Sequence, residues 1–101
     1  MPWPHPSNLI YVVDNERMYY VYLLKSLKTG EIYFGYTQDL KRRFEEHNQG
    51  RNTSTKRNFP WKLVYYESYA SERDARVREK RLKYDGRGLA MLKKRISNSL
   101  I

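Results

Sequence analysis

Two tyrosine-rich segments separated by a short turn place the strongest constraint on the fold of this chain. Residues Met18–Lys25 (MYYVYLLK) and Glu31–Thr37 (EIYFGYT) are rich in the aromatic and aliphatic side chains that favour strands. The turn between them contains Gly30, whose backbone is permissive. The two segments therefore predict an antiparallel hairpin, although its register does not follow from the sequence.

The pattern after the hairpin predicts one more strand and three helices. Gly50 ends the first helix, Ser71 and Asp74 resemble a capping box that opens the second, and residues 85–88 break the chain before the third. The chain length of 101 residues allows one domain with one modest core. We therefore expect a single α+β domain with the order ββαβαα. Its segments after the hairpin are a helix from Asp39 to about Gln49, a polar basic loop over residues 50–60, a strand over Trp61–Ser68, a helix from Glu72 to Tyr84 and a helix over Leu89–Ile96.

The first 17 residues differ from the rest. Three prolines within the first six positions disfavour a helix or an internal strand there. The apolar run Leu9–Val13 is too short for a signal peptide, and we expect it to add at most one short strand. We interpret residues 1–17 as a partly ordered extension and residues 18–101 as the domain.

The charge of the chain indicates a polyanionic partner. Lys and Arg number 20 against 11 Asp and Glu, a formal net charge of +9, concentrated in residues 38–62 and 72–95. No apolar run approaches the ~20 residues that span a bilayer. The absence of cysteine excludes disulfides and thiolate metal sites, and it fits a reducing cytoplasmic setting. We expect a cytoplasmic monomer that binds nucleic acid and not a membrane.

Two charged residues lie on apolar helix faces. Arg43 falls in the stripe formed by Leu40, Phe44 and His47, where an aliphatic residue would be ordinary. An arginine there can also extend its head to the edge of the helix and reach solvent. Arg43 is therefore either an amphipathic surface residue or a group that faces a pocket.

Glu79 poses the same question on the second long helix, because it lies between Ala75 and Leu82 on one face. An ion pair with Arg78 or Lys80 is one interpretation. The other is that Glu79 and Arg43 line one pocket against the sheet. Glu79 would then be a hard oxygen ligand for a divalent cation, and the Arg43 guanidinium would hold a phosphate.

Tyrosines in the hairpin could join such a pocket. Tyr22 and Tyr33 can present their hydroxyls on one face of the sheet, although tyrosine is also an ordinary strand residue. Gly35 leaves a hole in the second strand, which often marks the close approach of a ligand or another backbone.

These residues together resemble the GIY-YIG nuclease domain. The likeness covers roughly residues 18–97 and is closest to small stand-alone bacterial members related to the catalytic domain of the nucleotide excision repair incision subunit. It implies a three-stranded antiparallel sheet flanked by helices, and metal-dependent hydrolysis of nucleic acid. The matching segments are Tyr20-Val21-Tyr22, Tyr33-Phe34-Gly35, Asp39-Leu40 with Arg43 and His47, Trp61-Lys62-Leu63-Val64-Tyr65, and Arg78-Glu79-Lys80.

The resemblance implies roles for five side chains. Tyr22 and Tyr33 would flank the attacking water, with Tyr22 as the base and Tyr33 orienting it, or the reverse. Arg43 matches the catalytic arginine, Glu79 the glutamate that binds Mg²⁺ or Mn²⁺, and His47 a histidine near the scissile phosphate.

Three departures accompany the resemblance. The first motif reads Tyr20-Val21-Tyr22 instead of Gly-Ile-Tyr, and Tyr36 stands where the excision repair enzymes have a lysine. No asparagine near the end of the domain matches the polar residue of several relatives. Part of the site is therefore left unassigned.

The expected function is a divalent-metal-dependent endonuclease acting on DNA, with repair or recombination as its setting. RNA is a second possible substrate, and a non-catalytic basic DNA- or RNA-binding module is the alternative function. Sequence-independent contacts with phosphates are expected from Arg42, Lys56, Arg57 and Lys62.

Overall fold

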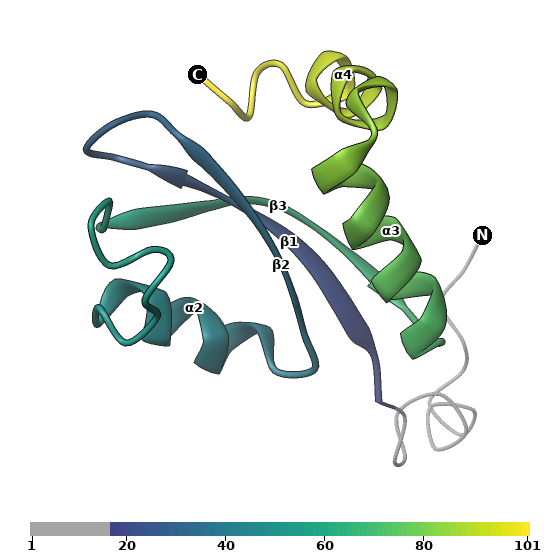
Figure 1. Ribbon diagram of the computed structural model, residues 1–101, viewed down its shortest axis with the longest axis horizontal. Helices are drawn as coiled ribbons and strands as arrows, with labels where there is room; N and C mark the ends of the chain where they lie inside the picture. Colours follow the sequence, from purple (N-terminus) through teal and green to yellow (C-terminus); the bar gives the residue numbers. More distant parts are fainter. Residues whose placement is uncertain (1–16) are drawn as a thin grey trace, which may run out of the picture.

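The computed structural model describes residues 17–101, which form three antiparallel strands and three helices (Figure 1). The expected α+β class and the order ββαβαα are confirmed. The short strand expected at Leu9–Val13 lies outside the described residues. None of the helices described in residues 17–101 combines the length and apolarity needed to cross a bilayer. The elements are β1 (Tyr19–Ser26), β2 (Ile32–Thr37), α2 (Leu40–Asn48), β3 (Trp61–Tyr69), α3 (Glu72–Tyr84) and α4 (Gly86–Arg95).

The sheet has the order β2-β1-β3, so the most apolar strand is in the middle and β2 is an edge. Four consecutive residues of β1, Val21 to Leu24, are buried because both faces and both edges of this strand are covered. In the β1–β2 register Tyr22 lies opposite Gly35. On the other side, the β1–β3 register shifts between Leu23 and Leu24.

Alternate residues of β1 pack on different helices, because successive strand side chains point to opposite faces. Val21 and Leu23 contact one cluster with side chains of α3 and α4, whereas Tyr22 and Leu24 pack with Trp61 and with residues of α2. Figure 1 shows α2 on one side of the sheet and α3 on the other. The molecule therefore has a separate α2 face and α3 face.

The helix ends follow local capping signals. The Asp39 side chain accepts a hydrogen bond from the Arg42 backbone and starts α2, and Gly50, with φ of 70°, follows its end. Ser71 caps α3 as expected. The last helix begins at Gly86 and not at Leu89, because the Asp85 side chain accepts from the Arg87 backbone and starts a helix there.

Candidate active site

Tyr22 reaches the edge of the sheet by lying over Gly35. A Cβ atom built on Gly35 would lie 2.1 Å from both the Cζ and the hydroxyl oxygen of Tyr22. The gap in β2 is therefore filled by a side chain of the neighbouring strand, where the sequence suggested a ligand or another backbone. Only glycine at this position leaves room for the phenol ring.

A chain of hydrogen bonds runs from Tyr22 into the interior of the α2 face. The Tyr22 hydroxyl lies 2.8 Å from Nε2 of His47, and Nδ1 of His47 lies 2.8 Å from the Thr55 hydroxyl. His47 and Thr55 are both fully buried. The Tyr33 ring packs edge-on against His47, with 5.2 Å between the ring centroids. Thr55, in the loop after α2, is a partner that no feature of the sequence indicated.

The buried environment holds the pair uncharged. Burial raises the pKa of Tyr22 to about 12, and the Arg43 guanidinium beside it only partly offsets this rise. Burial, together with the positive charge of Arg43, lowers the pKa of His47 to about 4. The Thr55 hydroxyl donates its one proton to the Asn52 carbonyl, so it accepts a hydrogen bond from Nδ1–H of His47. Nε2 of His47 is then unprotonated and accepts from the Tyr22 hydroxyl.

Arg43 lies between this hydrogen-bonded chain and solvent. Its guanidinium forms an ion pair with Glu46 at 3.1 Å and remains one-third exposed. Together with Arg17 and Arg42 it lines an open pocket of about 720 Å³, which we call the basic pocket. Arg43 thus faces the basic pocket and also contacts Tyr22.

Glu79 approaches the same edge of the sheet from α3. Its carboxylate lies 3.3 Å from the Lys83 ammonium, which itself lies 5.6 Å from the centre of the Tyr33 ring. The negative charge of Glu79 contributes to the raised pKa of Tyr22, which places the two groups in one electrostatic environment. The ion-pair partner of Glu79 is Lys83, and not Arg78 or Lys80, the partners that one interpretation of the sequence offered.

Arg78 points to a different partner. It donates to both carboxylate oxygens of Glu67 on β3, at 2.9 to 3.1 Å, and Tyr65 and Tyr69 donate to the same carboxylate. Successive residues of an α-helix are rotated by about 100°. This clamp on β3 therefore turns Glu79 away from β3 and towards the β2 edge.

The Glu79 carboxylate suits a hydrated hard cation. Within residues 17–101 no three His, Asp or Glu side chains gather closely enough to enclose a metal ion. Mg²⁺ commonly keeps several waters and binds through one or two carboxylates together with substrate phosphate. A single carboxylate at Glu79, in the same electrostatic environment as Tyr22, fits that mode of binding.

The four expected phosphate contacts do not share one surface. Arg42 lines the basic pocket, and Lys56 and Arg57 are exposed in the loop that follows α2. Lys62 is paired with Lys25, whose ammonium donates to the Leu100 carbonyl on the α3 face. Because directly paired strand residues share a face, Lys62 lies on the side of the sheet opposite α2.

Tyr36, the residue that replaces a lysine of the excision repair enzymes, lines the basic pocket but directs its hydroxyl towards α3. Its hydroxyl donates to Glu72 at 2.7 Å, and the Arg76 guanidinium lies 4.5 Å from its ring centre. Tyr36 therefore joins β2 to the first turn of α3.

A family model for the GIY-YIG catalytic domain matches residues 18–89. A UPF0213 protein of Bacillus pumilus is 39% identical over 66 residues, which are 64% of this chain and 66% of that protein. A UPF0213 protein of Streptococcus pneumoniae is 38% identical over 65 residues, 63% of this chain and 65% of that protein. The chain thus spans just under two thirds of the length of these two relatives. The solution NMR structure of a UPF0213 protein from Bacillus halodurans is 32% identical, covering 75% of this chain and 85% of that one, with a TM-score of 0.46.

Proposed function

We propose that this chain, which belongs to the GIY-YIG catalytic domain family, is a divalent-metal-dependent endonuclease that hydrolyses phosphodiester bonds of DNA. One observation carries the proposal: the buried Tyr22–His47 hydrogen bond ends at the sheet edge that Arg43 reaches from α2 and Glu79 from α3. A structural role alone would not require two opposite charges around a buried phenol.

The Tyr22–His47 pair removes the proton of the attacking water. Tyr22 gives its hydroxyl proton to Nε2 of His47 and takes a proton from water at its oxygen, while the water oxygen bonds to phosphorus. The bond between phosphorus and the leaving sugar oxygen breaks, and that oxygen takes a proton from solvent water. Tyr22 need not exist as a phenolate, which its pKa of about 12 makes scarce at neutral pH. His47 later returns the proton through Tyr22 to solvent.

Substrate binding strengthens this proton transfer. The Arg43 charge lowers the pKa of His47, so a phosphate bound at Arg43 offsets that charge and makes the imidazole a better acceptor. In the transition state Arg43 stabilises the negative charge on the phosphate oxygens. Tyr33, packed on His47, keeps the imidazole in position.

Glu79 is the residue that would hold the metal. A Mg²⁺ or Mn²⁺ ion there supplies positive charge and Lewis-acid polarisation of the phosphate. Glu79 is 20% exposed and engaged only by Lys83 among the ion pairs of residues 17–101, so its carboxylate is accessible to a hydrated cation.

The substrate is held mainly through its backbone. Arg42 in the basic pocket, with Lys56 and Arg57 beyond the far end of α2, offers charge without base recognition. Such contacts suit DNA in repair or recombination intermediates. RNA has the same phosphate backbone and is the second candidate substrate.

The test compares Glu79→Gln with Glu45→Gln, which makes the same charge change at an exposed position of α2. Labelled single-stranded, duplex and branched DNA and RNA are incubated with Mg²⁺, Mn²⁺ or EDTA. Glu79→Gln and Arg43→Ala should each reduce cleavage by about 100-fold or more, since about 1.4 kcal/mol of lost transition-state stabilisation is tenfold. Glu45→Gln should cleave normally, and Glu79→Gln should still bind DNA.

Two results would contradict the proposal. Normal cleavage by Glu79→Gln would show that Glu79 is only the ion-pair partner of Lys83. Binding of nucleic acid by the wild type without metal-dependent cleavage of any substrate would instead identify a non-catalytic binding module.

A further inference from the structure

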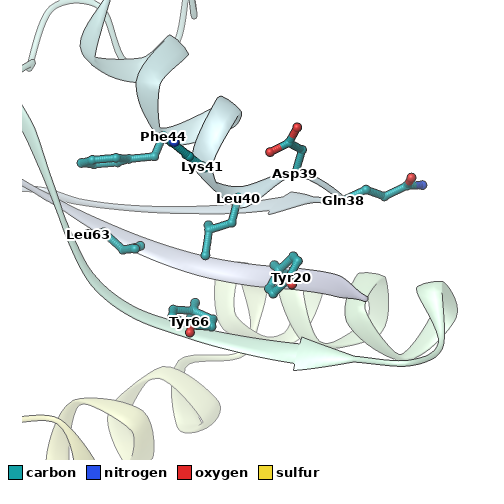
Figure 2. A pocket seen from close by; sticks show the side chains of 8 residues that line it. All are labelled: Tyr20, Gln38, Asp39, Leu40, Lys41, Phe44, Leu63 and Tyr66. Carbon is teal, nitrogen blue, oxygen red and sulfur yellow. The ribbon is translucent and has the colours of Figure 1, made fainter. Parts of the chain in front are cut away.

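A second pocket adjoins the basic pocket on the α2 face. It has a volume of about 530 Å³, and its walls are mostly aromatic and aliphatic, so we call it the aromatic recess. Tyr20, Gln38 and Asp39 line both pockets, so these three side chains form a wall that the two pockets share. The recess is lined by Tyr20, Gln38, Asp39, Leu40, Lys41, Phe44, Leu63 and Tyr66 (Figure 2).

The recess exists because α2 is too short to cover its face of the sheet. The helix has nine residues, and Figure 2 shows Leu40 reaching from its first turn towards the strands while Tyr20 and Tyr66 lie on the strands below. Tyr20 and Tyr66 pack edge to face, with ring centroids 5.9 Å apart. Such pairs are common between neighbouring strands, but here Tyr66 remains 52% exposed.

The surroundings of the recess match a nucleotide. A volume of this size lies in the range of small-ligand pockets, and an exposed tyrosine ring is a platform on which a base can stack. The adjoining pocket carries Arg17, Arg42 and Arg43, which attract phosphate and not a neutral apolar partner. One base and its neighbouring phosphate would thus occupy the two pockets together.

The departure of the first motif contributes a wall of this recess. Tyr20 stands at the position of the glycine in Gly-Ile-Tyr, and it is one of the three side chains that line both the aromatic recess and the basic pocket. A glycine there would remove part of the shared wall and the edge-to-face partner of Tyr66.

From these observations we infer that the aromatic recess binds one unpaired nucleobase, next to the phosphate held at Arg43. The inference rests on the proposed function, because it takes a nucleic acid as the substrate. A base inside a duplex is paired and stacked, so it cannot enter the recess without leaving the helix. The protein therefore prefers single-stranded or unpaired segments, in DNA or in RNA.

The experiment measures binding in EDTA, where no cleavage is needed. Fluorescence anisotropy gives Kd for four ligands of equal length: single-stranded DNA, single-stranded RNA, duplex DNA, and an abasic deoxyribose-phosphate strand that keeps the charge and lacks the bases. Tyr66→Ala is compared with Tyr66→Phe, which keeps the ring, and with Tyr66→Leu, which keeps apolar bulk. Tyr84→Ala is the matched control, since Tyr84 is 83% exposed on α3.

Removing the ring should weaken binding of the single strands about 10-fold, as expected for one lost stacking contact. Tyr66→Phe and Tyr84→Ala should bind like the wild type. The abasic strand should bind the wild type about 10-fold more weakly than DNA, and Tyr66→Ala should no longer distinguish the two. Duplex binding should be unchanged, and the comparison of DNA with RNA shows which sugar the site accepts.

Several outcomes would overturn the inference. If Tyr66→Ala lost affinity equally for the single strand, the duplex and the abasic strand, Tyr66 would support the fold and not bind a base. Circular dichroism of Tyr66→Ala and the affinity of Tyr66→Leu check this outcome. Wild-type affinity in Tyr66→Ala, with cleavage intact, would refute the recess and leave the proposed nuclease standing. The expected binding pattern combined with normal cleavage by Glu79→Gln would support the recess and contradict the proposed nuclease mechanism.

Discussion

At the scale of single residues, Gly35 determines the position of the Tyr22 ring, which occupies the space that a side chain at residue 35 would fill. Gly35→Ala places a Cβ 2.1 Å from the phenol, so the ring or the strand must move. We expect the free energy of unfolding to fall by about 3 kcal/mol, in the range of overpacked cores, and cleavage to fall with it. Urea denaturation measures the loss. Gly86→Ala, with no atom within 4 Å of its Cβ, is the control, and equal stability of the two variants would contradict the geometry.

His47 makes stability depend on pH in a defined window. The pKa of His47 is about 4 in the folded protein against an ordinary 6.5, so the unfolded state binds the proton first as pH falls. Its contribution to stability is complete above pH 6.5 and is lost as pH falls from about 6.5 to 4, by about 3 kcal/mol. Arg43 and Glu46 are the charged groups that face it.

The check is a series of denaturation curves between pH 4.5 and 7.5 for the wild type and His47→Gln. The variant should be less stable at pH 7 and should show a flatter dependence in this window. The pKa of Glu67 lies below its usual range, because the hydrogen bonds from Arg78, Tyr65 and Tyr69 outweigh its burial, and its effect is common to both proteins and cancels in the comparison. Parallel curves would show that His47 does not titrate as described.

At the scale of the elements, the orientation of α3 decides whether Glu79 joins the site. Arg78 holds Glu67 with a two-pronged contact, which a lysine cannot reproduce. Arg78→Lys should therefore lower the free energy of unfolding by about 1–2 kcal/mol, because the pair is largely buried. Arg76→Lys changes an exposed pair with Glu72 on the same helix, and we expect a change below about 0.5 kcal/mol.

Thermal or urea unfolding of the two variants provides the measurement. If Arg76→Lys lost as much stability as Arg78→Lys, the buried clamp on β3 would not be what fixes α3. Cleavage by Arg78→Lys also reports on the rotation of the helix, since Glu79 is the next residue along the chain.

At the scale of the whole molecule, the net charge of +9 predicts a steep salt dependence of binding. Contact with roughly four to six phosphates of a duplex gives a slope of log K against log salt of about −4 to −5. Arg42→Ala should make the slope smaller by about 1, because Arg42 lines the basic pocket. Lys62→Ala should leave the slope unchanged, because Lys62 lies on the opposite face of the sheet.

Anisotropy titrations at several salt concentrations measure these slopes. A flat salt dependence in the wild type would mean that the basic segments do not bind phosphates. An equal effect of the two variants would mean that the nucleic acid extends beyond the α2 face.

The local signals of the sequence predicted the elements well. Apolar runs, the Asp39 and Ser71 caps and Gly50 each act within a few residues, so strands and helices were predicted close to their observed bounds. The start of α4 was the exception. The two glycines in its first turn favoured a break in the chain before Leu89, whereas the Asp85 side chain caps a helix that begins at Gly86. The resemblance also marked the residues of the candidate site before any contact was known.

The relations between distant segments needed the tertiary structure. The order β2-β1-β3, the overlap of Tyr22 with Gly35 and the pairing of Glu79 with Lys83 depend on how the strands and helices pack together. Thr55 could not be found in advance, because a threonine in a polar loop carries no signal until the loop folds back on His47. The sequence by itself determined which groups are available and which local structures they favour. Packing of the chain decided which of them meet, because contacts between distant residues depend on shape and burial across the whole domain.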